Sequence, residues 1–206
     1  METIADYLTQ LASESPAPGG GSAATIVAAA GASLVAMVAR ICSANPRYRE
    51  HRDLTRALIA RADELRLDLL RARPRDEAAF EAVVAAGTMP KNTGEERELR
   101  RIALQHALRE AAEEPLRSAQ RGLDVLRAAS QALAIPNRNL ASDLGCAAEF
   151  AYAALAACAY NVRINHRFMH DAETIRRQAQ ALERCEREAL AVISAVRRAV
   201  ISRLIP

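Results

Sequence analysis

Apolar residues recur along this chain at helical spacing, and no stretch alternates between apolar and polar residues over a useful length. In the N-terminal segment, Ile4, Tyr7, Leu8 and Leu11 follow one another at i, i+3, i+4 and i+7. With Pro, Gly and Asn taken as helix breakers, the pattern predicts about eight helices, and Pro115 either kinks one helix or opens the next. The predicted helices cover approximately residues 4–13, 22–42, 49–71, 76–87, 93–114, 115–133, 142–168 and 172–203.

Two of these segments, 22–42 and 142–168, are rich in Ala and apolar nearly all round. A helix that is apolar on every side is buried, so we expect these two at the centre and the Arg/Glu-rich helices outside them. The sequence therefore predicts an all-α fold, one domain over residues 1–206, built as a bundle of about eight helices around two central Ala-rich helices. The run 23–39 is too short and too rich in Ala, Gly and Ser for a membrane span, and a buried core helix is the better interpretation.

The approach to the first Ala-rich helix has an unusual composition. Two prolines, Pro16 and Pro18, stiffen the chain, and Gly19, Gly20 and Gly21 follow directly before Ser22. Glycine adopts backbone angles closed to other residues and lets another group approach the backbone closely. A helix N-terminus also carries unpaired N–H donors. This stretch is either a tight turn between closely packed helices or a ligand-binding loop, and three successive glycines favour the loop.

Composition excludes some functions. The chain has 206 residues, half of them apolar and 3% aromatic, with a net charge of +3 from interleaved acidic and basic residues. Arg-rich segments without aromatic interleaving do not indicate nucleic acid. No C-x-x-C pair joins the four cysteines, and no secretory signal is evident. Free buried thiols in a reducing compartment, and hence a cytoplasmic location, are the prediction.

Several polar residues stand where they are costly or conspicuous. Lys91 is the one Lys among 28 basic residues and lies in a predicted loop. Asn161 and Asn165 share one face of a predicted buried helix, where they need either backbone or ligand partners. Asp143 and Asp76 each stand where a helix is expected to start, and a carboxylate there is most often a cap. No third ligand accompanies the paired His166 and His170, so no metal site is predicted.

The motifs together resemble the cyclodeaminase/cyclohydrolase family, which comprises methenyltetrahydrofolate cyclohydrolases and the cyclodeaminase domain of formiminotransferase-cyclodeaminase. The resemblance covers nearly the whole chain in order and spacing. It rests on Ser15 to Ala24, Asp76-Glu77-Ala78-Ala79-Phe80, Met89-Pro90-Lys91-Asn92-Thr93, Asn137 to Asp143, and Asn161-Val162-Arg163-Ile164-Asn165. Two departures are Arg75, where an acidic residue often precedes the Asp, and Ala44-Asn45-Pro46-Arg47-Tyr48 in place of a Lys-rich segment.

The resemblance implies a homodimer that binds a small folate substrate, with no metal or separate cofactor and no nucleic-acid or membrane partner. The expected reaction is hydrolysis of 5,10-methenyltetrahydrofolate to 10-formyltetrahydrofolate. A cyclodeaminase acting on formiminotetrahydrofolate is the alternative enzyme, and a non-catalytic folate-binding or helical scaffold protein is the alternative of another class.

The resemblance also suggests roles for individual residues. Asp143 is the candidate general base or cation stabiliser, Asp76 is the alternative, and Lys91 either orients water or contacts an anionic group. The candidate substrate-binding residues are Pro18, Gly19, Gly20, Gly21, Ser22, Arg47, Ser142, Asn161 and Asn165.

Overall fold

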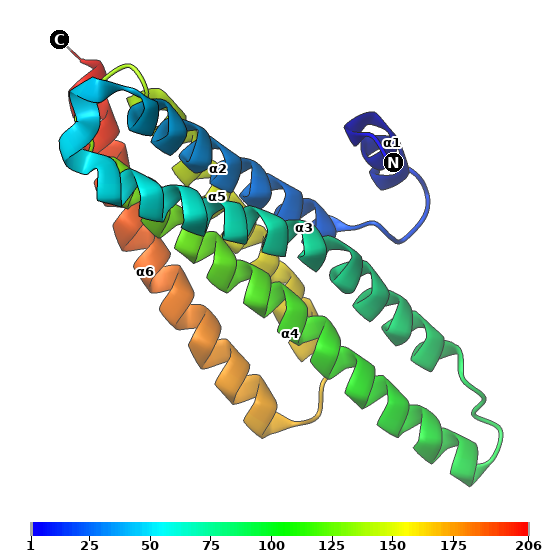
Figure 1. Ribbon diagram of the computed structural model, residues 1–206. Helices are drawn as coiled ribbons and strands as arrows, with labels where there is room; N and C mark the ends of the chain where they lie inside the picture. The colour runs from blue at the N-terminus through cyan, green and yellow to red at the C-terminus, as the bar shows by residue number, and fades with distance from the viewer. Residues whose placement is uncertain (1, 206) are drawn as a thin grey trace.

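The computed structural model describes residues 2–205, and within that range the chain forms helices and no strand. It confirms the all-α class (Figure 1). The elements are α1 (Ile4–Leu11), α2 (Gly20–Ala44), the short 3₁₀ helix η1 (Pro46–His51), α3 (Arg52–Thr88), α4 (Gly94–Ala132), α5 (Ala141–His166) and α6 (Ala172–Leu204).

The described residues form six α-helices where about eight were predicted, and both differences occur at a proline, one of them at Pro115, where a single helix was the alternative. Pro74 lies inside α3 and Pro115 lies inside α4, and neither helix ends there. A proline inside a helix removes one hydrogen bond and crowds the preceding turn. Here buried side chains before and after each proline hold one continuous helix against the bundle: Leu69 and Ala86 in α3, and Ala111 and Leu116 in α4. Tertiary packing outweighs the local cost.

Side chains cap three of the helices. Thr3 and Thr93 form capping boxes, and Asp171 caps α6 through the N–H of Thr174. The interpretation of Asp143 as a cap is wrong, because α5 starts at Ala141 and has no side-chain cap. Asp76 opens no helix either, since it lies well inside α3. Neither aspartate is therefore explained by capping.

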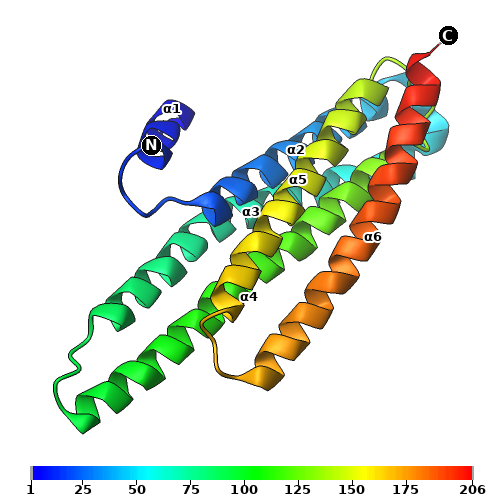
Figure 2. The same ribbon diagram turned by 180° about the vertical axis from the view of Figure 1, so that it is seen from behind.

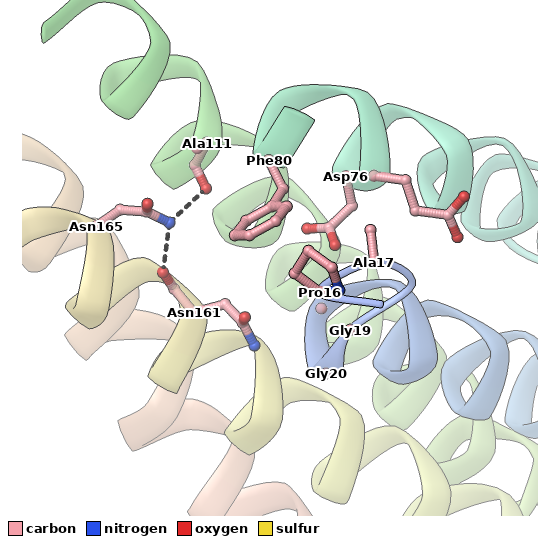
Figure 3. Close-up of a pocket in the computed structure, with 11 residues that line it drawn as sticks. Pro16, Ala17, Gly19, Gly20, Asp76, Phe80, Ala111, Asn161 and Asn165 are labelled. Atoms are coloured by element: carbon pink, nitrogen blue, oxygen red, sulfur yellow. Dashed lines mark hydrogen bonds between the residues drawn. The ribbon is translucent and has the colours of Figure 1, made fainter. Parts of the chain in front are cut away.

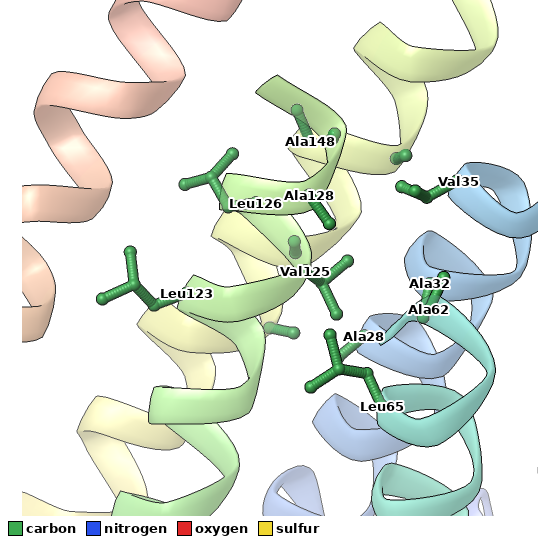
Figure 4. Packing of buried hydrophobic residues seen from close by; sticks show 14 of the residues in the cluster. Ala28, Ala32, Val35, Ala62, Leu65, Leu123, Val125, Leu126, Ala128 and Ala148 are labelled. Carbon is green, nitrogen blue, oxygen red and sulfur yellow. The ribbon is translucent and has the colours of Figure 1, made fainter. Parts of the chain in front are cut away.

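The predicted central helices α2 and α5 do form the middle of the bundle. The main hydrophobic cluster joins them to α3, α4 and α6, and small side chains such as Ala28, Ala32 and Ala148 alternate with Leu65 and Leu126 (Figure 4). By length and composition alone, α2 is apolar enough to cross a membrane, with a mean hydropathy of 1.9. Its apolar window is 61% buried inside the bundle, as expected for a core helix.

Helix α1 stands away from the bundle, and the loop over residues 12–19 connects it to the start of α2 (Figures 1 and 2). Its anchor is Tyr7, which is 4% exposed. The Tyr7 hydroxyl is hydrogen-bonded to Ser22 Oγ at 2.9 Å, and the Arg73 guanidinium lies 4.7 Å from the centre of the Tyr7 ring. Ile4 and Leu8 remain exposed.

The four cysteines are free, and three of them are buried as predicted. Cys146 is exposed, so the prediction of a buried thiol is wrong at that position. The reason lies in the helix face: Ala147 and Ala148 point into the bundle, while Cys146 lies on the outer side of α5.

Truncation of the core should show how strongly the bundle depends on close packing. Leu126 is completely buried at the centre of the cluster. We expect Leu126→Ala to lower the free energy of unfolding by about 2–5 kcal/mol, because it leaves a cavity among rigidly packed helices. Urea denaturation followed by circular dichroism measures the change. Leu190→Ala, at a position 55% exposed, is the matched control and should cost much less; equal losses would contradict this description of the core.

Candidate functional site

A small cavity of about 210 Å³ lies where the glycine loop meets α3, α4 and α5 (Figure 3). It is placed beside the N-terminal end of α2 and towards the C-terminal end of α5. Its walls come from four separate segments of the chain: Pro16, Ala17, Gly19, Gly20, Gly21, Asp76, Glu77, Phe80, Ala111, Asn161 and Asn165.

The carboxylate of Asp76 lies directly against the backbone of Gly21. A Cβ atom added to Gly21 would stand 2.5 Å from Asp76 Oδ2 and 2.6 Å from Oδ1. Real Cβ atoms do not approach other atoms so closely, so any side chain at position 21 would displace the carboxylate. The prediction that the glycines permit a close approach is thus confirmed at Gly21, and the approaching group belongs to the protein itself.

The prediction that these glycines adopt backbone angles closed to other residues is wrong. None of the glycines in residues 2–205 has a positive φ angle, so this loop does not need the backbone freedom that glycine alone has. At Gly20 an added Cβ would stand 3.8 Å from Asn161 Nδ2, which is ordinary contact. The requirement for glycine in the free protein is therefore steric and falls on Gly21.

Burial raises the pKa of Asp76 to about 6, and the negative charges of Glu114 and Glu77 add to the effect. A hydrogen bond from the Ser22 backbone opposes the shift but does not cancel it. Glu114 is only 5% exposed and accepts two hydrogen bonds from Arg75, at 3.2 Å from Nε and 3.1 Å from Nη2. Arg75, a departure from the family pattern, thus pairs with a buried acid instead of with Asp76.

The two asparagines reach the cavity from α5. The Asn165 amide nitrogen donates to Ala111 O at 2.9 Å and to Asn161 O at 2.8 Å (Figure 3). The Asn161 amide nitrogen donates to Ala157 O at 2.9 Å. Since carbonyl oxygens only accept hydrogen bonds, these contacts fix the orientation of both amides. Neither Oδ1 atom has a hydrogen-bond donor among the described residues, so both remain available as acceptors.

The cavity therefore has a distinct chemical character. Its polar side chains offer acceptors, namely the Asp76 carboxylate and two amide oxygens, while the Glu77 carboxylate at the wall pairs with Arg73, with Oε1 3.2 Å from Nε. The ring of Phe80 adds an apolar surface, and none of the lining residues is Arg, Lys or His. Such a site suits a flat ligand that carries hydrogen-bond donors and positive charge.

The structure brings together some of the predicted site residues. Gly19, Gly20, Gly21, Asp76, Asn161 and Asn165 all line the cavity. Pro18 and Ser22 are not among the lining residues, and the Ser22 hydroxyl is hydrogen-bonded to Tyr7 and to Gly19 O.

The remaining predicted residues are not brought to this cavity within one chain. Ser142 and Asp143 are in the first turn of α5, and Asn161 follows Asp143 by 18 residues, which is about 27 Å of helix. Arg47 is exposed in η1, at that same far end. Lys91 is exposed in the loop between α3 and α4, which is the tip in the lower right of Figure 1. The 12 residues from Asp76 to Thr88 alone span about 18 Å.

Six residues at or behind the cavity were not predicted as site residues: Pro16, Ala17, Glu77, Phe80, Ala111 and Glu114. Phe80 follows Asp76 at i+4, so helical spacing offered a signal once 76–80 is known to be helical. Glu114 had no signal, because its proximity to Asp76 depends on how α4 packs on α3.

No metal-binding site is evident among the residues that the structure describes. Residues 2–205 hold no group of three or more His, Cys, Asp or Glu side chains placed to bind a metal ion. His166 Nε2 is hydrogen-bonded to Gln178 Oε1 at 2.9 Å, which gives that imidazole a structural partner.

A five-helix core with a detached N-terminal helix, together with an acceptor-lined cavity beside a glycine loop, defines a helical ligand-binding domain. Comparison with known proteins identifies the family to which this domain belongs. The family described as formiminotransferase-cyclodeaminase matches residues 3–184, and this chain belongs to that family.

Individual relatives support the assignment. The chain is 36% identical over 182 residues to a methenyltetrahydrofolate cyclohydrolase of Methylorubrum extorquens, with 88% of each chain covered. It is 35% identical over 166 residues to the formimidoyltransferase-cyclodeaminase of Rattus norvegicus, but covers only 30% of that longer protein. Its fold is similar to the crystal structure of a formiminotetrahydrofolate cyclodeaminase from Thermotoga maritima, with a TM-score of 0.89, 26% identity and 98% of both chains covered.

Proposed function

We propose that this protein acts in tetrahydrofolate one-carbon metabolism and hydrolyses 5,10-methenyltetrahydrofolate to 10-formyltetrahydrofolate. The observation that carries the proposal is the carboxylate of Asp76, partly buried against Gly21 in a cavity whose side chains offer hydrogen-bond acceptors. Its support from relatives is the cyclohydrolase that matches along nearly the whole chain.

The substrate fits the character of the cavity. Its reacting part is a formamidinium cation, in which one carbon bridges N5 and N10, fused to a flat pterin ring. The pterin carries N–H donors, which the free Oδ1 atoms of Asn161 and Asn165 are placed to accept. Phe80 offers the ring an apolar surface, and the carboxylate of Asp76 favours the cation electrostatically.

In the proposed mechanism Asp76 transfers the protons. The carboxylate takes a proton from a water molecule as the water oxygen bonds to the bridging carbon, which gives a neutral tetrahedral intermediate. The bond from that carbon to N5 then breaks, and the Asp76 carboxylic acid protonates N5. The hydroxyl proton of the intermediate passes to solvent as the formyl C=O forms on N10. Substrate cation and water thus yield the formyl product and one proton.

The raised pKa of Asp76 suits this role. A general base works best when its pKa lies near the operating pH, because it is then ionised and still basic enough to accept a proton. An ordinary aspartate, with a pKa near 3.8, is a weak base; at about 6, Asp76 is stronger and remains mostly ionised at neutral pH. The surroundings that raise the pKa are burial, Glu114 and Glu77.

Formiminotetrahydrofolate cyclodeaminase activity is the second candidate, favoured by the match to the Thermotoga maritima structure. In that reaction N10 attacks the formimino carbon on N5, and ammonia leaves. The same Asp76 would take the proton from N10 and supply one to the departing nitrogen. The cavity would therefore hold the same carbon in either reaction.

We also propose the setting in which the enzyme works: a cytoplasmic homodimer that uses no metal or separate cofactor. The support for this is the family resemblance, together with a mechanism that assigns both proton transfers to a side chain of the protein.

Parallel assays separate the possibilities. The protein is incubated with 5,10-methenyltetrahydrofolate, followed by its absorbance, and with 5-formiminotetrahydrofolate, followed by ammonia release. We expect loss of the methenyl absorbance well above the uncatalysed rate, and little ammonia. Ammonia release without methenyl hydrolysis would favour the cyclodeaminase. Folate binding with neither reaction would contradict the proposal and favour the non-catalytic alternative.

A further inference from the structure

Helix α4 contains a proline at a place where helices usually exclude it. Pro115 is buried and lies well inside α4. Proline is the least favourable residue in a helix interior, because it lacks a backbone N–H and its ring crowds the carbonyl group four residues earlier. For Pro115 that carbonyl belongs to Ala111. The proline therefore disturbs the residue of α4 that lines the cavity.

The carbonyl oxygen of Ala111 has a donor from another helix. In a regular helix it would accept a hydrogen bond from the backbone N–H of residue 115, which proline does not have. Ala111 is only 8% exposed, and a buried carbonyl without a partner is costly. Asn165 Nδ2 donates to Ala111 O at 2.9 Å (Figure 3). A side chain of α5 thus supplies the hydrogen bond that the proline cannot make.

This hydrogen bond helps to decide which end of the Asn165 amide faces the cavity. An amide nitrogen carries two hydrogens, and those of Asn165 are directed to Ala111 O and, at 2.8 Å, to Asn161 O. A flipped amide would set Oδ1 against two carbonyl oxygens. Oδ1 is therefore the polar atom that Asn165 leaves for a ligand, and it can only accept a hydrogen bond.

We propose that Pro115 is a positioning residue of the ligand site: because it has no N–H, the Ala111 carbonyl is left to hold the Asn165 amide with Oδ1 towards the ligand. A residue with an N–H at position 115 would bond Ala111 O within α4, and the Asn165 amide would lose one of its two anchors. The amide would then be free to turn and present a donor, which suits a pterin N–H poorly. The proposal rests on the function proposed above, since the pterin is the ligand that this orientation favours.

The other proline inside a helix lacks this arrangement. Pro74 in α3 is exposed, and the carbonyl four residues earlier belongs to Leu70, which is 45% exposed and does not line the cavity. Among residues 2–205, no side chain donates a hydrogen bond to Leu70 O. Pro74 therefore serves as the matched control for the effect of a proline within a helix.

A double-mutant cycle on KM tests whether Pro115 acts through Asn165. We expect Pro115→Ala to raise KM for 5,10-methenyltetrahydrofolate by about 3- to 10-fold, with a smaller change in kcat, as for one weakened hydrogen bond. In the Asn165→Ala background the same change should leave KM unaltered, because the side chain that Pro115 positions is gone. The effect of Pro74→Ala on KM, whatever its size, should be the same with and without Asn165.

Thermal unfolding of the same variants gives a readout that needs no activity. Asn165→Ala leaves Ala111 O without its donor, so we expect it to lower Tm. In the Pro115→Ala background the backbone of residue 115 supplies a donor, so removal of Asn165 should lower Tm by less. Circular dichroism confirms that all variants remain helical.

Equal losses of Tm in the two backgrounds would overturn the proposal. It would also fail if the KM effects of Pro115→Ala and Asn165→Ala multiplied in the double variant, as independent changes do. Wild-type protein that is inactive on both folate substrates would instead contradict the proposed function. The Tm comparison would then still decide whether Pro115 acts through Asn165.

Discussion

Replacement of Asp76 by Asn is expected to lower kcat for methenyl hydrolysis by about 10²- to 10⁴-fold, the usual contribution of a positioned general base. Asn keeps the shape of the side chain and can still accept the hydrogen bond from the Ser22 backbone, so the cavity should survive. It cannot take the proton from water. Steady-state kinetics with 5,10-methenyltetrahydrofolate measures the loss, and retained turnover would exclude Asp76 as the base.

The same substitution should make the protein more stable at neutral pH. Because the pKa of Asp76 is raised to about 6 from 3.8, the folded protein holds this proton more tightly than the unfolded chain does. Stability is therefore lost as the pH rises from about 4 to 6, by up to about 3 kcal/mol for a shift of this size. Asp76→Asn removes that loss. Thermal unfolding should show a higher Tm for the variant at pH 7.5 and no difference near pH 4; a lower Tm at pH 7.5 would contradict the account of this carboxylate.

Gly21→Ala is expected to lower kcat/KM by about 10- to 100-fold without unfolding the protein. The new methyl group would stand 2.5 Å from Asp76 Oδ2, so the carboxylate must move, and a displacement of about 1 Å in a catalytic group has an effect of this order. The helix itself should tolerate the change, because Ala is a better helix former than Gly.

A matched control is available in α3. A Cβ on Gly87 would meet no atom within 4 Å, and Gly87 takes no part in the cavity. Gly87→Ala should therefore keep the wild-type kcat/KM. Circular dichroism confirms that both variants fold. If Gly21→Ala and Gly87→Ala were equally active, the close approach of Asp76 to the α2 backbone would have no role in catalysis.

Sequence patterns predicted the fold well where they report burial, and less well where they report helix ends. The two Ala-rich segments are central, as their lack of a polar face required. The helix end predicted at Pro74 does not exist, and at Pro115 the chain follows the alternative of one helix instead of two. The favourable packing of α3 and α4 along their whole length is not visible locally.

Only part of the candidate site was predicted, because contacts between helices depend on packing that is not visible in local sequence patterns. The glycine loop, Asp76, Asn161 and Asn165 were singled out by motif or by polar residues in apolar helices, and the structure gathers them in one cavity. Asp143 was ranked before Asp76, although the predicted helix 142–168 contains both Asp143 and Asn161, and 18 residues of helix already separate them by about 27 Å. The contribution of Glu114 to the pKa of Asp76 depends on helix packing, which no local pattern shows.

The pH dependence of kcat/KM is the most direct test of the claim that the Asp76 cavity catalyses methenyl hydrolysis. Only ionised Asp76 accepts a proton, so kcat/KM, corrected for the uncatalysed reaction, should rise about tenfold per pH unit below an apparent pKa of about 6 and level off above it. The residual activity of Asp76→Asn should lack that inflection. An inflection near pH 6 that persists unchanged in Asp76→Asn would contradict the account.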